Sequence, residues 1–216
     1  MSAGTELHDI YINHKNELEN RLDDFRSRWA EGSDQDIFEE LCYCLCTARE
    51  KAKYAFAAMG SLRKTKKLFK GSEAEIDAVL LESGIALHPA KAQRIIQNRE
   101  IYYPGTKKKI EKEFLCFNDI LLSRRELKNR INGFGFKEAS HFLRNLGFGE
   151  KICILDTHTA QQLVQYKVIS ERPSSWTEKK YLEVERAMIG FAKKVKIPVD
   201  ALDLVFMLKE NPEIIK

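Results

Sequence analysis

Apolar side chains recur along this 216-residue chain at intervals of three, four and seven positions, which is the spacing of one helical face. Alternating patterns typical of strands are rare. One stripe near the N-terminus consists of Leu7, Tyr11, Leu18, Leu22, Phe25 and Trp29. Further helices are predicted near 35–47, 50–59, 74–82, 89–102, 124–131, 136–147, 157–166, 177–195 and 198–209. The pattern therefore predicts an all-α fold.

Capping residues and a proline indicate where some of these helices begin. The sequence "SWTE" (175–178) has the Ser-x-x-Glu form of a capping box, and Pro198 suits the first turn of the last helix. That helix contains "VDALDLVFMLK", which is apolar on nearly all sides apart from two aspartates. We expect it to be buried or to line a pocket.

Composition narrows the class of protein. A hydrophobic fraction of 44% with 31% charged residues is typical of a folded globular chain of one large domain or two smaller lobes. No stretch approaches a membrane span, and the start "MSAGTELHDI" lacks the layout of a signal peptide. The expectation is an intracellular, cytoplasmic protein.

The five cysteines, Cys42, Cys44, Cys46, Cys116 and Cys153, form no CxxC pair of the kind that holds zinc or iron–sulfur clusters. Cys42 and Cys46 share one face of a predicted helix. We therefore expect reduced, mostly buried thiols, with no metal and no cofactor.

The net charge of +4 and the pI of about 8.7 permit a polyanionic partner without requiring one. Lysines cluster in "RKTKK" (63–67) and "GTKKKIEKE" (105–113). Each cluster is compatible with a solvated helical face or loop and with phosphate contact.

The segment "INGFGFKEASHFLRNLG" (131–147) predicts two helices joined by a short Gly-Phe-Gly turn. Glycines in such a turn can adopt positive φ and present backbone N–H groups, which predicts a phosphate cradle at Gly133, Phe134 and Gly135. A Gly-x-Gly between helices is weak evidence for DNA binding on its own, because glycine also ends helices for structural reasons.

Two residues in this region carry candidate chemistry. Lys137 falls in the first turn of the second helix, where its charge opposes the helix dipole, and this favours the neutral, nucleophilic amine. In "CILDTHTAQQL" (153–163), Asp156 ends an apolar run at the N-cap position of the next helix. Most such aspartates only cap, and the pairing with Lys137 is what makes this one a candidate.

The segments "GFGFKEASHFLRNLGF" and "ICILDTHTAQQL" resemble the helix-hairpin-helix DNA glycosylases, and most closely the archaeal and bacterial type of 8-oxoguanine DNA glycosylase/AP lyase. The similarity extends through "FEELCYCLCTA" (38–48), "HPAKAQRIIQNR" (88–99) and "ALDLVFMLKENPEIIK" (201–216). In that family a lysine two residues after the second glycine of the hairpin and an aspartate at the start of the next helix are the catalytic pair. The resemblance implies these roles for Lys137 and Asp156.

The resemblance also implies two helical lobes flanking a DNA-binding cleft. One lobe is expected to be residues 34–150, with the helix-hairpin-helix at about 124–147. The other joins 1–33 to 151–216. The implied reaction is removal of 8-oxoguanine after base flipping, with a Schiff base on Lys137 and strand cleavage by β-elimination. The implied partner is double-stranded DNA carrying 8-oxoguanine or an abasic site, bound by a monomer.

By the same resemblance, the last helix and the terminal lysine form the base pocket. The implied pocket residues are Asp203, Phe206 or Met207, and Lys216, whose terminal carboxylate is a candidate acceptor for the base. Related sequences usually have an aromatic residue where this chain has Met207. The loop "ALHPAK" (86–91) offers Leu87 or His88 as a wedge into the duplex, although Pro89 explains the loop equally well.

Alternatives remain at this stage. A hairpin glycosylase for another lesion fits the same residues, and a hairpin module that only binds DNA fits all but the pairing of Lys137 with Asp156. His141 and Arg144 share a predicted polar face with Lys137, which suits either phosphate contact or solvent. His158 is compatible with a structural or a catalytic role.

Overall fold

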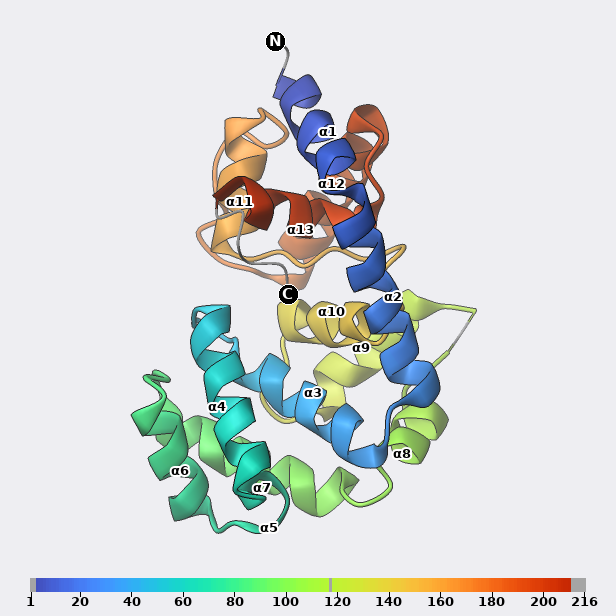
Figure 1. The fold of residues 1–216 in the computed structure, drawn as a ribbon. Helices are drawn as coiled ribbons and strands as arrows, with labels where there is room; N and C mark the ends of the chain where they lie inside the picture. Colours follow the sequence, from blue (N-terminus) through green and yellow to red (C-terminus); the bar gives the residue numbers. More distant parts are fainter. Residues whose placement is uncertain (1–2, 117, 211–216) are drawn as a thin grey trace. The chain divides into compact units, whose positions relative to one another are not determined.

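The computed structural model describes residues 3–116 and 118–210, which form helices and no β-strand (Figure 1). This confirms the predicted all-α class. The helices are α1 (Ala3–Asn13), α2 (Lys15–Glu31), α3 (Asp34–Cys46), α4 (Ala52–Lys64), α5 (Lys67–Lys70), α6 (Glu73–Glu82), α7 (His88–Tyr102), α8 (Thr106–Glu113), α9 (Ile120–Arg130), α10 (Phe136–Asn145), α11 (Thr157–Gln165), α12 (Glu178–Val195) and α13 (Val199–Glu210). Within this described part of the chain, no helix is long and apolar enough to span a bilayer.

Contacts between residues divide the chain into two compact units. The first comprises Met1–Ser27 and Leu143–Lys216, and the second comprises Arg28–Phe142. The divisions fall within α2 and within α10. The functional lobes implied by the resemblance are divided after residues 33 and 150, and that assignment stays a prediction.

In the first unit, α1 packs against α12 and α13, and α11 packs against α13. Tyr166, which follows α11, stacks on Phe191 of α12 and on Phe206 of α13, with ring centroids 5.6 and 6.1 Å apart. Every residue of α13 from Asp200 to Phe206 is buried. The expectation that this helix is buried is confirmed, because its apolar side chains face α1, α11 and α12.

In the second unit, α3 is the central helix and packs against α4, α7 and α8. It begins at a capping box, in which the Ser33 hydroxyl accepts from the Asp36 N–H at 3.3 Å and the Asp36 carboxylate accepts from the Ser33 N–H at 3.0 Å. It ends at Thr47, whose backbone N–H donates to the Tyr43 carbonyl. From Ile37 to Cys46, every residue of α3 except Glu39 is buried.

The cysteines are free thiols, and all but Cys116 are buried, as the sequence predicted. Burial raises the pKa of the Cys46 thiol to about 12, because a charged thiolate is poorly solvated in the interior. Among the described residues, no group of three histidine, cysteine or acidic side chains is placed to hold a metal ion.

Several helix limits differ from those predicted. The N-terminal stripe is divided between α1 and α2, with His14 between them. α9 begins at Ile120 instead of 124, because the Asp119 carboxylate accepts from the backbone N–H groups of the second and third residues of the helix at 3.1 Å each. The predicted capping box at Ser175 is wrong: Thr177 is the N-cap of α12, and its hydroxyl accepts from the Lys180 N–H.

The helix α8, which covers most of the second lysine cluster, was missed because so few of its residues are apolar. Only Thr106 and Ile110 are buried. Its first turn is held by the Asp34 carboxylate, which accepts from the N–H groups of Gly105 at 2.7 Å and Lys107 at 3.0 Å. The Lys107 ammonium donates to the Ala30 carbonyl at the end of α2, so this lysine already has a partner inside the protein.

Candidate active site

The predicted hairpin is present and consists of α9, the turn 131–135 and α10. Gly133 has φ +94°, and a Cβ there would lie 2.6 Å from Arg94 Cδ, so glycine is required for conformation and for space. Gly135 differs from the expectation because its φ is not positive. Its N–H donates to the Glu138 carboxylate at 3.0 Å.

Two buried polar side chains hold the hairpin in place. Asn98 of α7 donates to the Asn132 carbonyl at 2.9 Å and accepts from the Asn132 N–H at 3.3 Å, which fixes the residue before Gly133. Arg124 of α9 lies over the Phe136 ring, 5.4 Å from its centroid, and donates to the Ser140 hydroxyl at 3.3 Å. These contacts fix the turn and join the two helices of the hairpin.

Lys137 is the second residue of α10 and is half-buried. Its Nζ donates to the Thr47 hydroxyl at 3.0 Å and to the Thr47 carbonyl at 3.3 Å. The amine of the candidate nucleophile therefore lies against the C-terminal end of α3, where carbonyl groups without helical partners attract a positive charge.

Asp156 is the N-cap of α11, as predicted, and its carboxylate accepts from the Thr159 N–H at 2.8 Å. The preceding segment is tied to α12. The Tyr181 hydroxyl donates to the Cys153 carbonyl at 2.7 Å and accepts from the Leu155 N–H at 3.2 Å. Glu185 accepts from the Cys153 N–H at 2.8 Å. These bonds set the path of the chain into Asp156.

The implied base-pocket residues occupy different environments. Asp203 pairs with Arg144 at 3.0 Å; burial raises the pKa of its carboxyl, and the Arg144 charge opposes that rise. Phe206 is buried in the stack with Tyr166. Met207 is half-buried. Lys216 lies outside the described residues.

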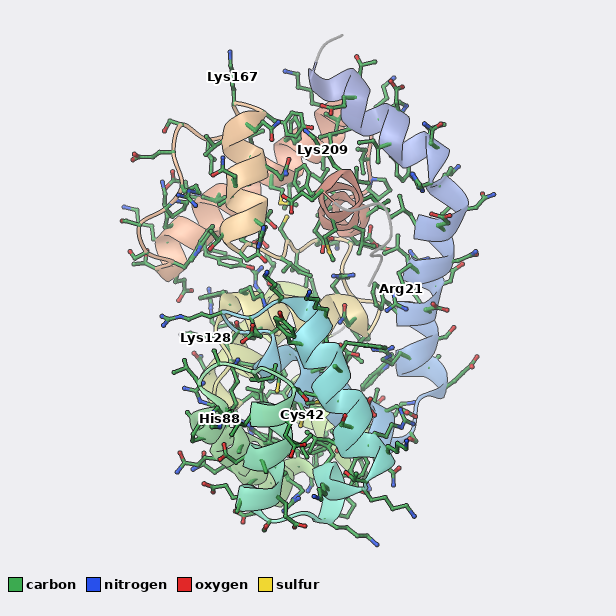
Figure 2. The ribbon with its side chains drawn as sticks, turned by 60° about the vertical axis from the view of Figure 1, so that its left-hand side comes forward. Arg21, Cys42, His88, Lys128, Lys167 and Lys209 are labelled. Atoms are coloured by element: carbon green, nitrogen blue, oxygen red, sulfur yellow. The ribbon has the colours of Figure 1, made fainter. Side chains whose placement is uncertain are left out.

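The two wedge candidates also differ. Leu87 is 61% exposed and has φ +54°, a left-handed conformation that is uncommon for leucine. His88, at the first position of α7 (Figure 2), lies with Nδ1 2.6 Å from the Asp77 carboxylate. Its ring therefore already has a partner on α6, whereas the Leu87 side chain extends into solvent.

The predicted polar face of α10 is wrong for two of its three members. His141 is buried, with Nδ1 3.5 Å from the Thr47 hydroxyl and its ring edge-on to Tyr43. Arg144 is also buried, with its guanidinium 4.6 Å from the centroid of the Phe25 ring. His158, in contrast, has a side chain that is 78% exposed and lies 3.6 Å from Glu210.

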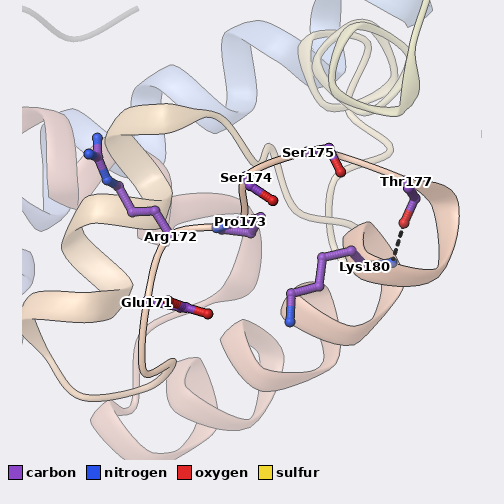
Figure 3. Close-up of a pocket in the computed structure, with 7 residues that line it drawn as sticks. All are labelled: Glu171, Arg172, Pro173, Ser174, Ser175, Thr177 and Lys180. Carbon is purple, nitrogen blue, oxygen red and sulfur yellow. Dashed lines mark hydrogen bonds between the residues drawn. The ribbon is translucent and has the colours of Figure 1, made fainter.

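A surface hollow lies in the segment between α11 and α12 (Figure 3). It is lined by Glu171, Arg172, Pro173, Ser174, Ser175, Thr177 and Lys180. Figure 3 shows the bond from the Lys180 N–H to the Thr177 hydroxyl that caps α12. The Lys180 ammonium pairs with Glu183. Asp203, Phe206 and Met207, the expected base-pocket residues that the structure describes, do not line this hollow.

Sequence reasoning missed the residues that hold the candidates in place, namely Thr47, Asn98 and Tyr181. A signal existed for Asn98 and for the neighbouring Lys91. Lys91, Ile95, Asn98 and Tyr102 follow one another at spacings of four, three and four, so the polar members occupy a buried helical stripe. Thr47 follows the end of a helix, where threonine is unremarkable, and nothing in the local sequence distinguishes it.

A family model and a relative of known name both relate this chain to 8-oxoguanine DNA glycosylases. The family model for 8-oxoguanine DNA glycosylase matches residues 18–197. A curated relative from Fusobacterium nucleatum, an 8-oxoguanine DNA glycosylase/AP lyase, is 35% identical over 212 residues, which cover 98% of this chain and 96% of the relative.

Two solved structures have the same fold as this chain over nearly its whole length. The crystal structure of the 8-oxoguanine DNA glycosylase of Thermotoga maritima matches with a TM-score of 0.87 at 29% identity and covers 99% of this chain and 98% of that one. The Methanocaldococcus jannaschii 8-oxoguanine glycosylase/lyase, in complex with a 15mer DNA containing 8-oxoguanine, matches with a TM-score of 0.88 at 25% identity and covers 100% of both chains. From its sequence, its helices and its hairpin, this chain belongs to the 8-oxoguanine DNA glycosylase family.

Proposed function

We propose that this chain is an 8-oxoguanine DNA glycosylase and AP lyase acting in base excision repair, with Lys137 as the nucleophile and Asp156 as the carboxylate that supports it. The family match over 18–197 and the activity in the relatives' names support the reaction. The observation that carries the residue assignment is the half-buried Lys137 amine, held by Thr47 in the first turn of α10, directly after the hairpin turn.

In the proposed reaction, the Nζ lone pair of Lys137 forms a bond to C1′ of the damaged nucleotide. The C1′–N9 bond breaks, its electron pair leaves with the base, and a proton passes from Nζ to the departing base. The sugar ring then opens: the nitrogen forms a double bond to C1′, while O4′ leaves with a proton from solvent. Loss of a C2′ proton expels the 3′ phosphate with the electron pair of its C3′–O bond, which cleaves the strand.

Asp156 has an electrostatic role in this proposal. Positive charge develops on the sugar as the glycosidic bond breaks, and a fixed carboxylate stabilises that charge more than it stabilises the neutral substrate. The bond from the Thr159 N–H to the carboxylate supports this role, and so do the bonds of the Tyr181 hydroxyl to Cys153 and Leu155, because they fix the backbone that leads to Asp156. A preorganised group of this kind does not have to reorient during the reaction.

DNA binding follows from the hairpin and the exposed loop. The turn at Gly133, Phe134 and Gly135 is proposed to meet the phosphate backbone, a contact that positions the DNA without reading its sequence. Leu87 is proposed as the wedge that fills the space left by the flipped nucleotide, since it is exposed and is held in a strained conformation. Met207 and Lys216 remain proposals for contact with the base, and Asp203 and Phe206 are proposed to support Met207 from within α13.

Purified protein incubated with duplexes carrying 8-oxoguanine, thymine glycol, uracil or an abasic site, with borohydride added, tests this function. We expect a covalent adduct and strand cleavage on the 8-oxoguanine and abasic duplexes, and neither for Lys137→Gln, which should still bind DNA. An adduct only on the abasic duplex would refute the lesion assignment. Binding without any adduct would indicate a hairpin module that only binds DNA.

A further inference from the structure

We propose that Thr47 is a positioning residue that aims the amine of Lys137 at the sugar. This inference rests on the proposed function, because it concerns the same nucleophile. In this proposal Thr47 contacts the amine of Lys137 and makes no contact with the sugar or the base. It acts by fixing the direction of the amine, and its hydroxyl is the group that distinguishes it from a residue of equal size.

The contacts around Thr47 place two acceptors in front of one amine. Its hydroxyl oxygen lies 3.0 Å and its carbonyl oxygen 3.3 Å from Lys137 Nζ. The hydroxyl hydrogen is directed elsewhere, to the Cys44 carbonyl at 2.9 Å. The oxygen therefore has lone pairs available for Lys137 while its own proton is occupied.

These two acceptors determine where the lone pair of the neutral, attacking lysine amine points. A neutral amine has two N–H bonds and one lone pair. When both hydrogens are held by two oxygens of one residue, the lone pair must point away from that residue. Thr47 would thus select one orientation of a flexible side chain, and such alignment of reacting atoms accounts for a large part of enzymatic rate acceleration.

Thr47 can perform this task because its own position is fixed. It caps α3, the buried central helix of its unit, and is itself 5% exposed. On the other side, the buried Lys91 of α7 donates from Nζ to the Cys46 carbonyl at 3.0 Å, which holds the peptide group just before Thr47. Burial lowers the pKa of Lys91, and the positive charge of Lys137 contributes further to this lowering.

A third contact of the Thr47 hydroxyl, besides those with Lys137 and Cys44, comes from the same helix as the nucleophile. His141 lies four residues after Lys137 on α10, and its Nδ1 is 3.5 Å from the Thr47 oxygen. Thr47 therefore bridges two successive turns of α10. The hydroxyl fixes the amine relative to the helix that carries it as well as relative to α3.

The test compares Thr47→Val with Thr47→Ser in the full-length protein. Valine keeps the branched shape and removes the hydroxyl, whereas serine keeps the hydroxyl. We expect the single-turnover rate of borohydride trapping on an abasic duplex to fall about 10- to 100-fold for Thr47→Val. Affinity for a duplex with an unreactive tetrahydrofuran site should change less than about twofold, and Thr47→Ser should recover most of the rate.

Thr65→Val is the matched control. Thr65 caps α4 with nearly the same backbone conformation, and its hydroxyl donates to the Ser61 carbonyl at 2.8 Å, but it makes no bond to Lys137. This variant loses a capping hydroxyl in the same way and should trap at the wild-type rate. If Thr47→Val does not fold, Thr47→Ala against Thr47→Ser provides the same comparison.

Trapping by Thr47→Val at the wild-type rate would overturn the inference while leaving the proposed function intact. A folded Thr47→Ser that is as slow as Thr47→Val would also overturn it, because the hydroxyl would then not be the group that matters. If the wild-type protein itself forms no adduct, the proposed function fails, which is a separate result.

Discussion

Replacing Tyr181 with phenylalanine tests whether the segment before Asp156 is held as the structure indicates. The substitution removes one oxygen and leaves the ring in place. The Cys153 carbonyl and the Leu155 N–H, which bond to that oxygen at 2.7 and 3.2 Å, both lose a partner. Because Tyr181 is 1% exposed, water cannot readily replace the hydroxyl.

The magnitude follows from these two bonds. A buried backbone group left without its partner costs about 1–3 kcal/mol, and removing the buried hydroxyl itself recovers part of the loss. We therefore expect the free energy of unfolding to fall by about 2–4 kcal/mol, which for a chain of this size lowers Tm by about 5–15 °C. No cavity contributes, because the ring is unchanged.

Thermal and urea unfolding measure the stability, and single-turnover base excision on an 8-oxoguanine duplex measures the effect on Asp156. We expect excision to slow by about 10- to 100-fold, because small displacements of an aligned group are costly. Tyr11→Phe is the control, since Tyr11 is 9% exposed and its hydroxyl makes no hydrogen bond to another described residue. A Tyr181→Phe protein as stable and as active as this control would refute the reasoning.

The remaining predictions concern glycines and thiols. Gly60→Ala should raise the free energy of unfolding by about 0.5–1 kcal/mol in denaturant titrations, because Gly60 lies within α4 and a Cβ there meets nothing within 4 Å. Gly133→Ala should lower the free energy of unfolding by about 1–3 kcal/mol and weaken DNA binding, since its φ is +94° and the added Cβ meets Arg94; an unchanged protein would contradict the turn geometry. A thiol reagent at pH 8 should modify Cys116 in the folded protein and all five cysteines after unfolding, because the other four are buried and the pKa of Cys46 is about 12; rapid labelling of Cys46 in the native state would argue against α3 as a buried helix.

The sequence predicts the helical class and most helix positions because apolar stripes at helical spacing are strong signals. It fails where a helix has little apolar surface. α5 is a single turn, and α8 has two buried residues and is fixed by Asp34, which lies more than seventy positions earlier in the chain. Such a tertiary contact leaves no trace in local periodicity.

The helix N-caps also show that local sequence alone does not always determine where a helix begins. Asp156 was correctly predicted as an N-cap because it stands between an apolar run and a helix. In "SWTE", Ser175 and Thr177 are both suitable caps, and the choice depends on where the chain turns. Local sequence cannot decide between two hydroxyl residues that are two positions apart.

In the candidate site, the sequence predicts the candidate residues but not the residues that hold them in place. Lys137 and Asp156 could be singled out as candidates, because each stands at a helix start beside a glycine turn or an apolar run. Their catalytic roles come from the family resemblance and stay a prediction. The residues that hold these two side chains in place could not be predicted from the sequence. His141 and Arg144 were expected on a polar face, yet both are buried because Thr47 and Asp203 provide partners inside the protein. A polar side chain is buried only when a partner exists, and that partner is distant in sequence.

The central claim is that Lys137 forms the covalent intermediate. The most direct measurement is mass spectrometry of the adduct that borohydride traps on a duplex containing 8-oxoguanine, after digestion of protein and DNA. The account predicts one modified peptide, with the sugar remnant on Lys137 and none on Lys91. A remnant on any other residue, or efficient strand cleavage with no trapped peptide, would contradict it.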